Sequence, residues 1–115
     1  PLICIFQPHQ AKRLNLLFKD FLGAFDDADI IFILPLYKVL GRDKKFPHDS
    51  ETLVRAMKKR TPKKPIFYLS QQKKIRNAVE TTLRSTPFKK SLTHSPVLVM
   101  MGAGDIADLT TLLLK

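Results

Sequence analysis

Apolar residues along this chain are grouped in short continuous runs, separated by longer segments with helical periodicity. Four such runs predict strands, at residues 2–6, 30–34, 66–69 and 97–101. Runs without polar alternation are typical of parallel strands that are buried on both faces of a sheet. Each run ends at a polar residue, a glycine or a proline, so the chain is expected to leave the sheet there.

The segments after the runs predict helices. Following the first run, apolar residues at helical spacing predict one continuous helix that closes at Asp26. Its apolar stripe consists of Leu14, Leu17, Phe18, Phe21, Leu22 and Phe25. Asp49 and Ser50 offer N-cap oxygens to a second helix, Ser70 offers one to a third, and Ile106 lies in a fourth.

This alternation of strands and helices predicts an α/β fold. We expect a Rossmann-like, mostly parallel sheet with helices on both faces and right-handed crossovers. The 115 residues suffice for a single domain with its own core, spanning residues 1–115. The chain begins at Pro1, without an initiating methionine and directly before a strand, so we expect an N-terminally truncated piece of a longer protein.

The composition indicates the class of protein and the cellular compartment to expect. Hydrophobic residues make up 44% of the chain, and no apolar run is long enough to cross a membrane. The single cysteine, Cys4, lies in the first apolar run and is expected to be a buried small hydrophobe. His48 and His94 stand in predicted loops and are expected to be solvated. Because the chain offers no disulfide pair and no signal peptide, we expect a cytoplasmic protein with no membrane partner.

The formal net charge of +10 permits a nucleic acid or another anion as a partner. Basic residues cluster between residues 42 and 64, but aromatic residues are not interleaved with them as on a base-stacking surface. A nucleic-acid partner is therefore not the favoured interpretation. A solvated helix end, with the residues from Lys58 to Lys64 exposed and dispensable for folding, explains the cluster better. Attraction of a phosphate-rich small substrate is a third interpretation.

The turn Phe6-Gln7-Pro8-His9 leaves the first predicted strand, and Arg13 follows four residues after the histidine. In open parallel sheets, ligands bind at the carboxyl ends of the strands, where this turn is expected to lie. An imidazole and a guanidinium at that edge could bind an anionic group. The same residues also permit a simpler interpretation, a surface turn that happens to hold a histidine and an arginine.

A second turn, Gly102-Ala103-Gly104-Asp105, follows the last predicted strand and precedes a helix. Its glycines would let a ligand approach the backbone, and the helix start would offer N–H groups to an anion. A tight turn with Asp105 as the helix N-cap fits the same residues. The chain has no phosphate loop of its own and no residues at metal-ligand spacing.

Both turns follow strands of one predicted sheet, so they are expected to share an edge. Arg13, His9, the helix start and Asp105 would then converge on one ligand. This combination suits a zwitterion such as an amino acid, with Arg13 and the helix start on the carboxylate and Asp105 on the ammonium group.

The two turns occur in order with Tyr37 and with Asp49-Ser50 followed by Leu53. This arrangement resembles the C-terminal domain of the Mur ligases, in the branch that adds L-alanine. The resemblance covers nearly the whole chain, and it is most specific in the combination of the first turn with the last.

The resemblance implies an ATP-dependent ligase of peptidoglycan synthesis. Such an enzyme activates the carboxylate of UDP-N-acetylmuramate as an acyl phosphate, which the amino group of L-alanine then attacks. ATP and Mg²⁺ are bound mainly by a central domain that this chain lacks, so the fragment is expected to hold no cofactor and to be inactive alone. The C-terminal domain is a lid that binds the amino acid and the nucleotide. The substrate-binding residues implied are His9, Arg13, Tyr37, Gly102, Gly104 and Asp105, and no catalytic residue is assigned.

The first turn departs from the usual family sequence, Phe-Gln-Pro-His-Arg-Tyr-Ser/Thr-Arg. Here Gln10, Ala11 and Lys12 stand between His9 and Arg13. Because a carboxamide cannot replace a two-pronged guanidinium, the change at Gln10 removes one contact to a carboxylate or phosphate. Two alternatives stay open: a small basic α/β nucleic-acid-binding module, and a degenerate Mur ligase paralogue that keeps the fold and has lost alanine binding.

Overall fold

The computed structural model describes residues 1–36, 46–85, 96–102, 106, 110 and 113. The strands in this part of the chain are β1 (Leu2–Phe6), β2 (Ile30–Ile33), β3 (Ile66–Tyr68) and β4 (Val97–Met101). The helices are α1 (Ala11–Leu16), α2 (Phe18–Ala24), α3 (Ser50–Arg60) and α4 (Ile75–Leu83), with a short 3₁₀ helix η1 (Gln72–Lys74) before α4. The predicted strands are confirmed, each to within one residue at either end.

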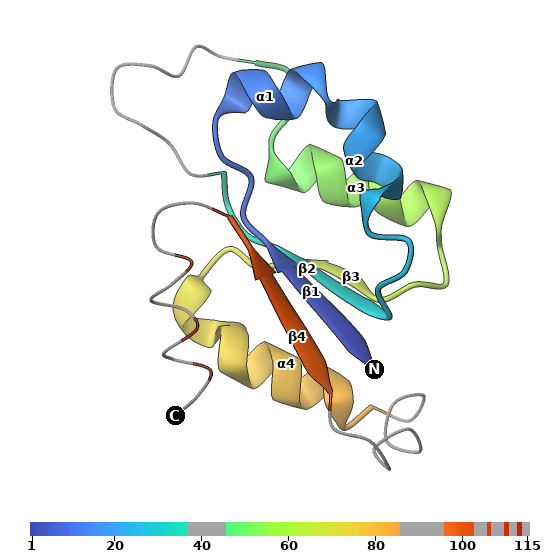
Figure 1. Ribbon diagram of the computed structural model, residues 1–115, viewed down its shortest axis with the longest axis vertical. Helices are drawn as coiled ribbons and strands as arrows, with labels where there is room; N and C mark the ends of the chain where they lie inside the picture. The colour runs from blue at the N-terminus through green and yellow to red at the C-terminus, as the bar shows by residue number, and fades with distance from the viewer. Residues whose placement is uncertain (37–45, 86–95, 103–105, 107–109, 111–112, 114–115) are drawn as a thin grey trace.

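The strands form one sheet in the order β3-β2-β1-β4, and all neighbouring strands are parallel. Helices α1, α2 and α3 cover one face of the sheet, and α4 covers the other (Figure 1). The chain moves outward from β1 to β3 and then returns to the opposite side of β1 for β4. Right-handed crossovers therefore switch faces at that reversal. The predicted α/β fold is confirmed.

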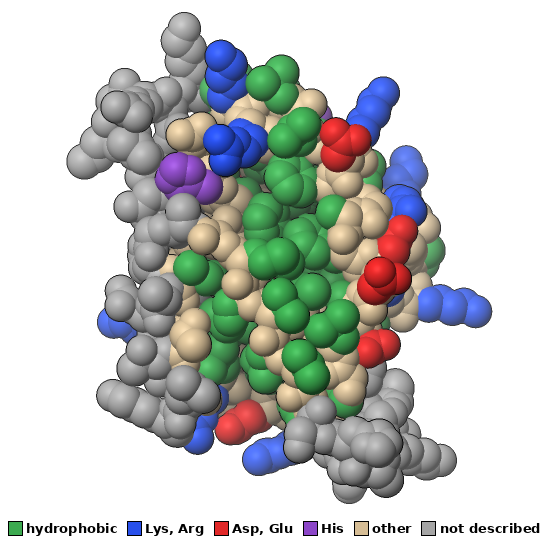
Figure 2. Space-filling view, in the orientation of Figure 1, with side chains coloured by type: hydrophobic (Ala, Val, Ile, Leu, Met, Phe, Trp, Pro, Cys, Tyr) green, Lys and Arg blue, Asp and Glu red, His purple; other side chains and the backbone are tan. Residues whose placement is uncertain are grey.

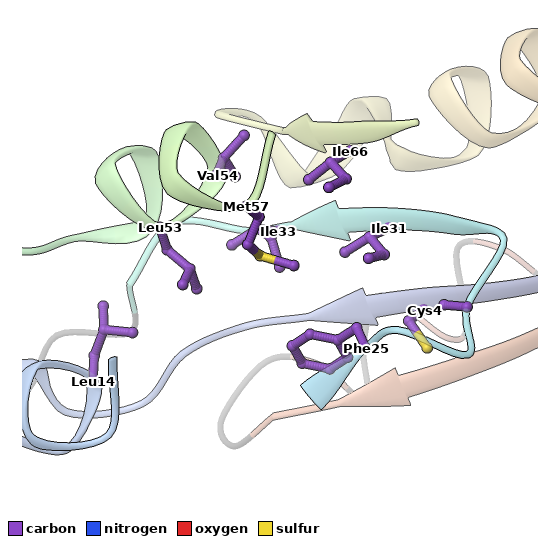
Figure 3. Packing of buried hydrophobic residues seen from close by; sticks show 10 residues of the cluster. Cys4, Leu14, Phe25, Ile31, Ile33, Leu53, Val54, Met57 and Ile66 are labelled. Carbon is purple, nitrogen blue, oxygen red and sulfur yellow. The ribbon is translucent and has the colours of Figure 1, made fainter. Parts of the chain in front are cut away.

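The apolar residues of the strands alternate between two cores, one on each face of the sheet. On the face of α1–α3, Leu14, Phe25 and Met57 share one core with Ile31 and Ile33 of β2 (Figure 3). The second core lies under α4 and consists of Ile3, Ile5, Ile30, Phe32, Leu34, Ile75 and Val79. Because each fully buried side chain of this size contributes roughly 1.5–3 kcal/mol, these two layers account for most of the stabilisation of the sheet.

Cys4 lies in the first core and is 7% exposed, so its predicted role as a small hydrophobe is confirmed. Burial raises the pKa of its thiol, which favours the protonated form. On the opposite core, the described residues Ile106 and Leu113 pack beside α4 and are helical, as the sequence predicts. No helix in the described ranges has the length and apolar character that a membrane crossing requires.

The single helix predicted after β1 is wrong, because the chain forms two helices separated at Leu17. Leu17 leaves helical geometry, with φ −106° and ψ 15°, and is 41% exposed. After the break, the rings of Phe21 and Phe25 pack against the ring of Phe6 in tilted arrangements, with centroid distances of 5.3 Å and 5.2 Å. A continuous helix would have kept Leu17 in the predicted apolar stripe. The packing of Phe21 and Phe25 on Phe6 of β1 accompanies the departure from that regular helical spacing.

Two further expectations are corrected. β4 was expected to be buried, but its side chains at Val97, Leu98 and Val99 are exposed, and within the described residues the strand lies at the edge of the sheet and pairs with β1 alone. Figure 2 shows a band of hydrophobic side chains on this face of the molecule, where β4 lies. Ser70 was expected to cap the third helix. Instead, η1 intervenes and α4 begins at Ile75 without a side-chain cap.

Candidate functional site

The strand order places a ligand site at the carboxyl ends of β1 and β4. The chain runs outward in one direction from β1, and β4 lies on its other side, so the topology reverses between these two strands. In open α/β sheets, the crevice at such a reversal is where ligands bind. The two turns singled out in the sequence, after Phe6 and after Met101, both leave the sheet here.

A pocket of about 290 Å³ opens at this reversal. Its walls are the turn from Phe6 to His9, Arg13 and Leu14 of α1, Phe21 of α2, and Gly102 after β4. This volume lies near the lower end of the roughly 300–1,000 Å³ that is usual for ligand sites, which suits a small molecule. The rings of Phe6 and Phe21 make part of the pocket apolar, so a charge held beside them is shielded from water.

Arg13 and His9 supply the polar chemistry of this pocket. Arg13 is exposed on α1, and within the described residues it has no ion-pair partner. His9 is half-buried in the turn that leads into the same helix. A guanidinium without an internal carboxylate can form a two-pronged contact with a carboxylate or phosphate of a ligand.

Gly102 has the backbone conformation that this corner requires. Its φ is +157°, and a Cβ added there would lie 3.1 Å from both the Cβ and the carbonyl oxygen of Gln7. The amide nitrogen of Gln7 donates to the carbonyl oxygen of Met101 at 2.9 Å, which fixes the two turns against each other. Any larger side chain at position 102 would push these turns apart.

Of the predicted site residues, the structure brings His9, Arg13 and Gly102 into one pocket. Tyr37, Gly104 and Asp105 lie outside the described residues. The proposed convergence of Asp105 with Arg13 therefore stays a prediction.

Asn15 fixes the approach to α3, a role that the sequence does not reveal. Its Nδ2 donates to the carbonyl oxygens of Ala11 at 2.8 Å and His48 at 3.0 Å, and its Oδ1 accepts from the His48 amide at 3.0 Å. The His48 ring stacks on Phe18 with centroids 3.8 Å apart, and its Nδ1 is buried. His48 is therefore not the solvated loop residue that was expected. His94 lies outside the described residues.

Asp49 and Ser50, the two residues predicted to cap α3, have different roles at the start of this helix. Asp49 is the N-cap and accepts from the Thr52 amide at 2.9 Å, completing a capping box. Ser50 does not cap the helix; its hydroxyl donates to the carbonyl oxygen of Leu34 at 2.6 Å, in a buried position. This bond ties α3 to the carboxyl end of β2, beside the pocket.

The basic cluster is only partly a solvated surface. Lys58, Lys59 and Lys63 are exposed, as expected. Arg60, however, makes a two-pronged ion pair with Asp26 at 2.6 and 2.9 Å and donates to the Leu22 carbonyl oxygen at 3.1 Å. The half-buried Lys64 donates to the backbone oxygen of Asp26 at 2.5 Å. These bonds connect the end of α3 and the segment after it to the end of α2. The predicted exposure holds for Arg60 but not for the half-buried Lys64, and dispensability for folding stays a prediction.

Known proteins with curated names match the chain over almost all of its length. It is 33% identical over 108 residues to UDP-N-acetylmuramate–L-alanine ligase of Hydrogenovibrio crunogenus, which is 94% of this chain and 21% of that protein. It is 30% identical over 108 residues to the ligase of the same name from Nitrosomonas eutropha. The third, from Ruthia magnifica, is 32% identical over 113 residues, 97% of this chain and 22% of that protein. No protein-family model matches the chain.

This chain spans about a fifth of the length of the curated relatives that it matches. The parallel α/β sheet is of the kind found in the C-terminal domain of these ligases. The resemblance carried by the two turns is thereby confirmed. The chain is homologous to a C-terminal region of the UDP-N-acetylmuramate–L-alanine ligases, members of the Mur ligase family.

Proposed function

We propose that this chain is the amino-acid- and nucleotide-binding lid domain of an ATP-dependent UDP-N-acetylmuramate–L-alanine ligase. The whole enzyme would join L-alanine to the muramyl carboxylate in the synthesis of the peptidoglycan precursor, in the cytoplasm. The observation that carries the proposal is the pocket at the reversal of strand order, with Arg13 exposed on its wall and without an internal partner among the described residues. The names of the relatives support the ligase class.

Within this pocket, Arg13 would bind the carboxylate of L-alanine, with His9 donating or accepting a hydrogen bond beside it. The small volume favours a small amino acid. Gly102 lets the backbone approach the ligand, and we assign the ammonium group to Asp105. We include Tyr37 and Gly104 as further contacts on the basis of the family resemblance.

ATP and Mg²⁺ would be bound mainly by another domain of the enzyme. The described residues contain no cluster of three or more histidine, cysteine, aspartate or glutamate side chains that could hold a metal ion. The part of the reaction that we assign to this chain is to bind and orient the amino acid and to exclude water when the lid closes.

Steady-state kinetics of the full-length enzyme test this proposal, with L-alanine and ATP varied separately. Replacing Arg13 or Asp105 by alanine removes a charged contact worth about 1.5–3 kcal/mol, so the dependence on L-alanine should weaken roughly ten- to a hundredfold. Lys12→Ala is the matched control, because Lys12 is an exposed neighbour on α1 that does not line this pocket.

An unchanged dependence on L-alanine in Arg13→Ala would refute the assignment of this pocket. A full-length protein that folds but shows no ligase activity would instead support the degenerate paralogue. A gel shift with nucleic acid that weakens steeply with salt would favour the nucleic-acid-binding module.

A further inference from the structure

Gln7 is a polar residue of the pocket wall whose side chain is buried and only half hydrogen-bonded. It is 2% exposed. Its Nε2 donates to the carbonyl oxygen of Pro35 over a long 3.5 Å, whereas its Oε1 is buried and has no hydrogen-bond partner among the residues that the structure describes. The carboxamide cannot be reversed, because Oε1 would then face the Pro35 carbonyl oxygen, and two acceptors repel each other.

Packing does not explain a glutamine at this position. A buried amide oxygen without a donor destabilises the folded state, since it has given up its hydrogen bond to water. A methionine has nearly the same length and shape and would fill the space without that penalty. Natural proteins break the rule of satisfied polar groups mainly at functional sites, and Gln7 lies beside Arg13 and Gly102 in the pocket.

We propose that Gln7 is a specificity-determining residue whose Oε1 accepts a hydrogen bond from the amino group of the bound amino acid, while Arg13 holds the carboxylate. This inference rests on the proposed function. Ammonium and amine groups carry N–H donors and require an acceptor. Oε1 of Gln7 is an acceptor in the pocket wall without a donor among the described residues.

Filling the pocket requires a small movement of the Gln7 side chain. Because Oε1 is shielded from water in this structure, the carboxamide must tilt toward the pocket to meet a donor. Its restraint is weak, since a contact of 3.5 Å to Pro35 lies at the limit of hydrogen bonding. A site built in this way rejects a ligand without the amino group, because Oε1 would stay unpaired.

The test uses the full-length ligase with the variants Gln7→Met and Gln7→Glu. Methionine removes the acceptor, so the KM for L-alanine should rise roughly ten- to a hundredfold. The KM for ATP should stay unchanged, and the melting temperature should not fall. Glutamate keeps an acceptor for the amino group but sets its second oxygen against the Pro35 carbonyl oxygen, so its melting temperature should fall while its KM for L-alanine stays within about threefold of the parent. Gln71→Met is the control, because Gln71 is exposed and far along the chain, before η1.

Two results would overturn the inference. If Gln7→Met leaves the KM for L-alanine unchanged, or lowers the melting temperature, the side chain serves folding. If Gln7→Glu folds but loses L-alanine as Gln7→Met does, the bond to Pro35 matters and Gln7 only positions the turn. Arg13→Ala, measured in parallel, distinguishes failure of this inference from failure of the proposed function. If Arg13→Ala raises the KM for L-alanine and Gln7→Met does not, only the role of Gln7 is refuted. If Arg13→Ala leaves the KM for L-alanine unchanged, the proposed function itself is refuted.

Discussion

Gln10 is the residue at which the turn of the pocket carries backbone strain. It has φ 66° and ψ 117°, a region that residues with a Cβ rarely adopt, and α1 begins at the next residue. Such conformations cost on the order of 1–3 kcal/mol and persist where the surrounding structure imposes them. Here the turn must connect the end of β1 to α1 while keeping His9 and Arg13 at the pocket.

Replacing Gln10 by glycine should therefore stabilise the fold. Glycine accepts a positive φ without steric cost, and the gain should exceed its entropy penalty of roughly 0.5–1 kcal/mol. We expect a net increase of about 1 kcal/mol in the free energy of unfolding, measured by urea denaturation of the chain. Gln71→Gly is the control, since Gln71 has φ −122° and should lose stability. Equal losses in both variants would show that Gln10 is not strained.

The residues of the site differ in how far the sequence could predict them. His9, Arg13 and Gly102 were identified because their positions just after apolar runs fix them at the carboxyl ends of strands. Gln7 occupies the same turn and was not singled out, because a polar residue after a strand is usually exposed. Its burial comes from Pro35 and Gly102, which are distant in the sequence.

At the scale of elements, apolar runs predicted the strands well because a parallel strand needs nothing more than a short apolar segment. They could not reveal which strand lies at an edge: Val97–Met101 has the same pattern as the central Leu2–Phe6. The break at Leu17 was also hidden, since its spacing fits a continuous helix. Edge position and helix breaks depend on the other elements of the fold.

The contact between α2 and α3 predicts how stability depends on pH. The hydrogen bond from Arg60 lowers the pKa of Asp26 below its usual 3.8. A carboxyl whose pKa is lower in the folded state stabilises the fold above its unfolded pKa, and this contribution disappears as the pH falls through the folded value. Asp26→Asn should therefore lower the melting temperature near pH 7, and the difference from the parent should shrink below pH about 4.

Melting curves between pH 2 and pH 7 would measure this effect, at about one-unit steps through the range where carboxylates titrate. Asp27→Asn is the control, because Asp27 is exposed and adjacent but makes no ion pair with Arg60. The ion pair itself is exposed, so added salt should weaken it. A difference between Asp26→Asn and the parent that stays constant down to pH 2 would show that the ion pair is not its cause.

At the scale of the whole molecule, the same reversal of strand order creates the pocket and exposes β4. The reversal brings the turns after β1 and β4 together at one end of the sheet, and in the described part of the chain it leaves β4 with a neighbour on one side only. A band of hydrophobic side chains runs down this face of the molecule, and its lower part lies where β4 does (Figure 2). An exposed apolar edge strand offers unpaired backbone groups to any other strand.

The isolated chain should consequently self-associate through β4. Val97 is 58% exposed and Val99 37%, and charged side chains on an edge strand oppose pairing with another strand. The double variant Val97→Lys/Val99→Lys should be more monomeric in light scattering after gel filtration, and the free energy of unfolding should change by only about 0.5 kcal/mol per exposed site. Ala24→Lys, on the exposed surface of α2, controls for added positive charge. If it reduces association equally, net charge and not the edge of β4 governs the behaviour of the chain.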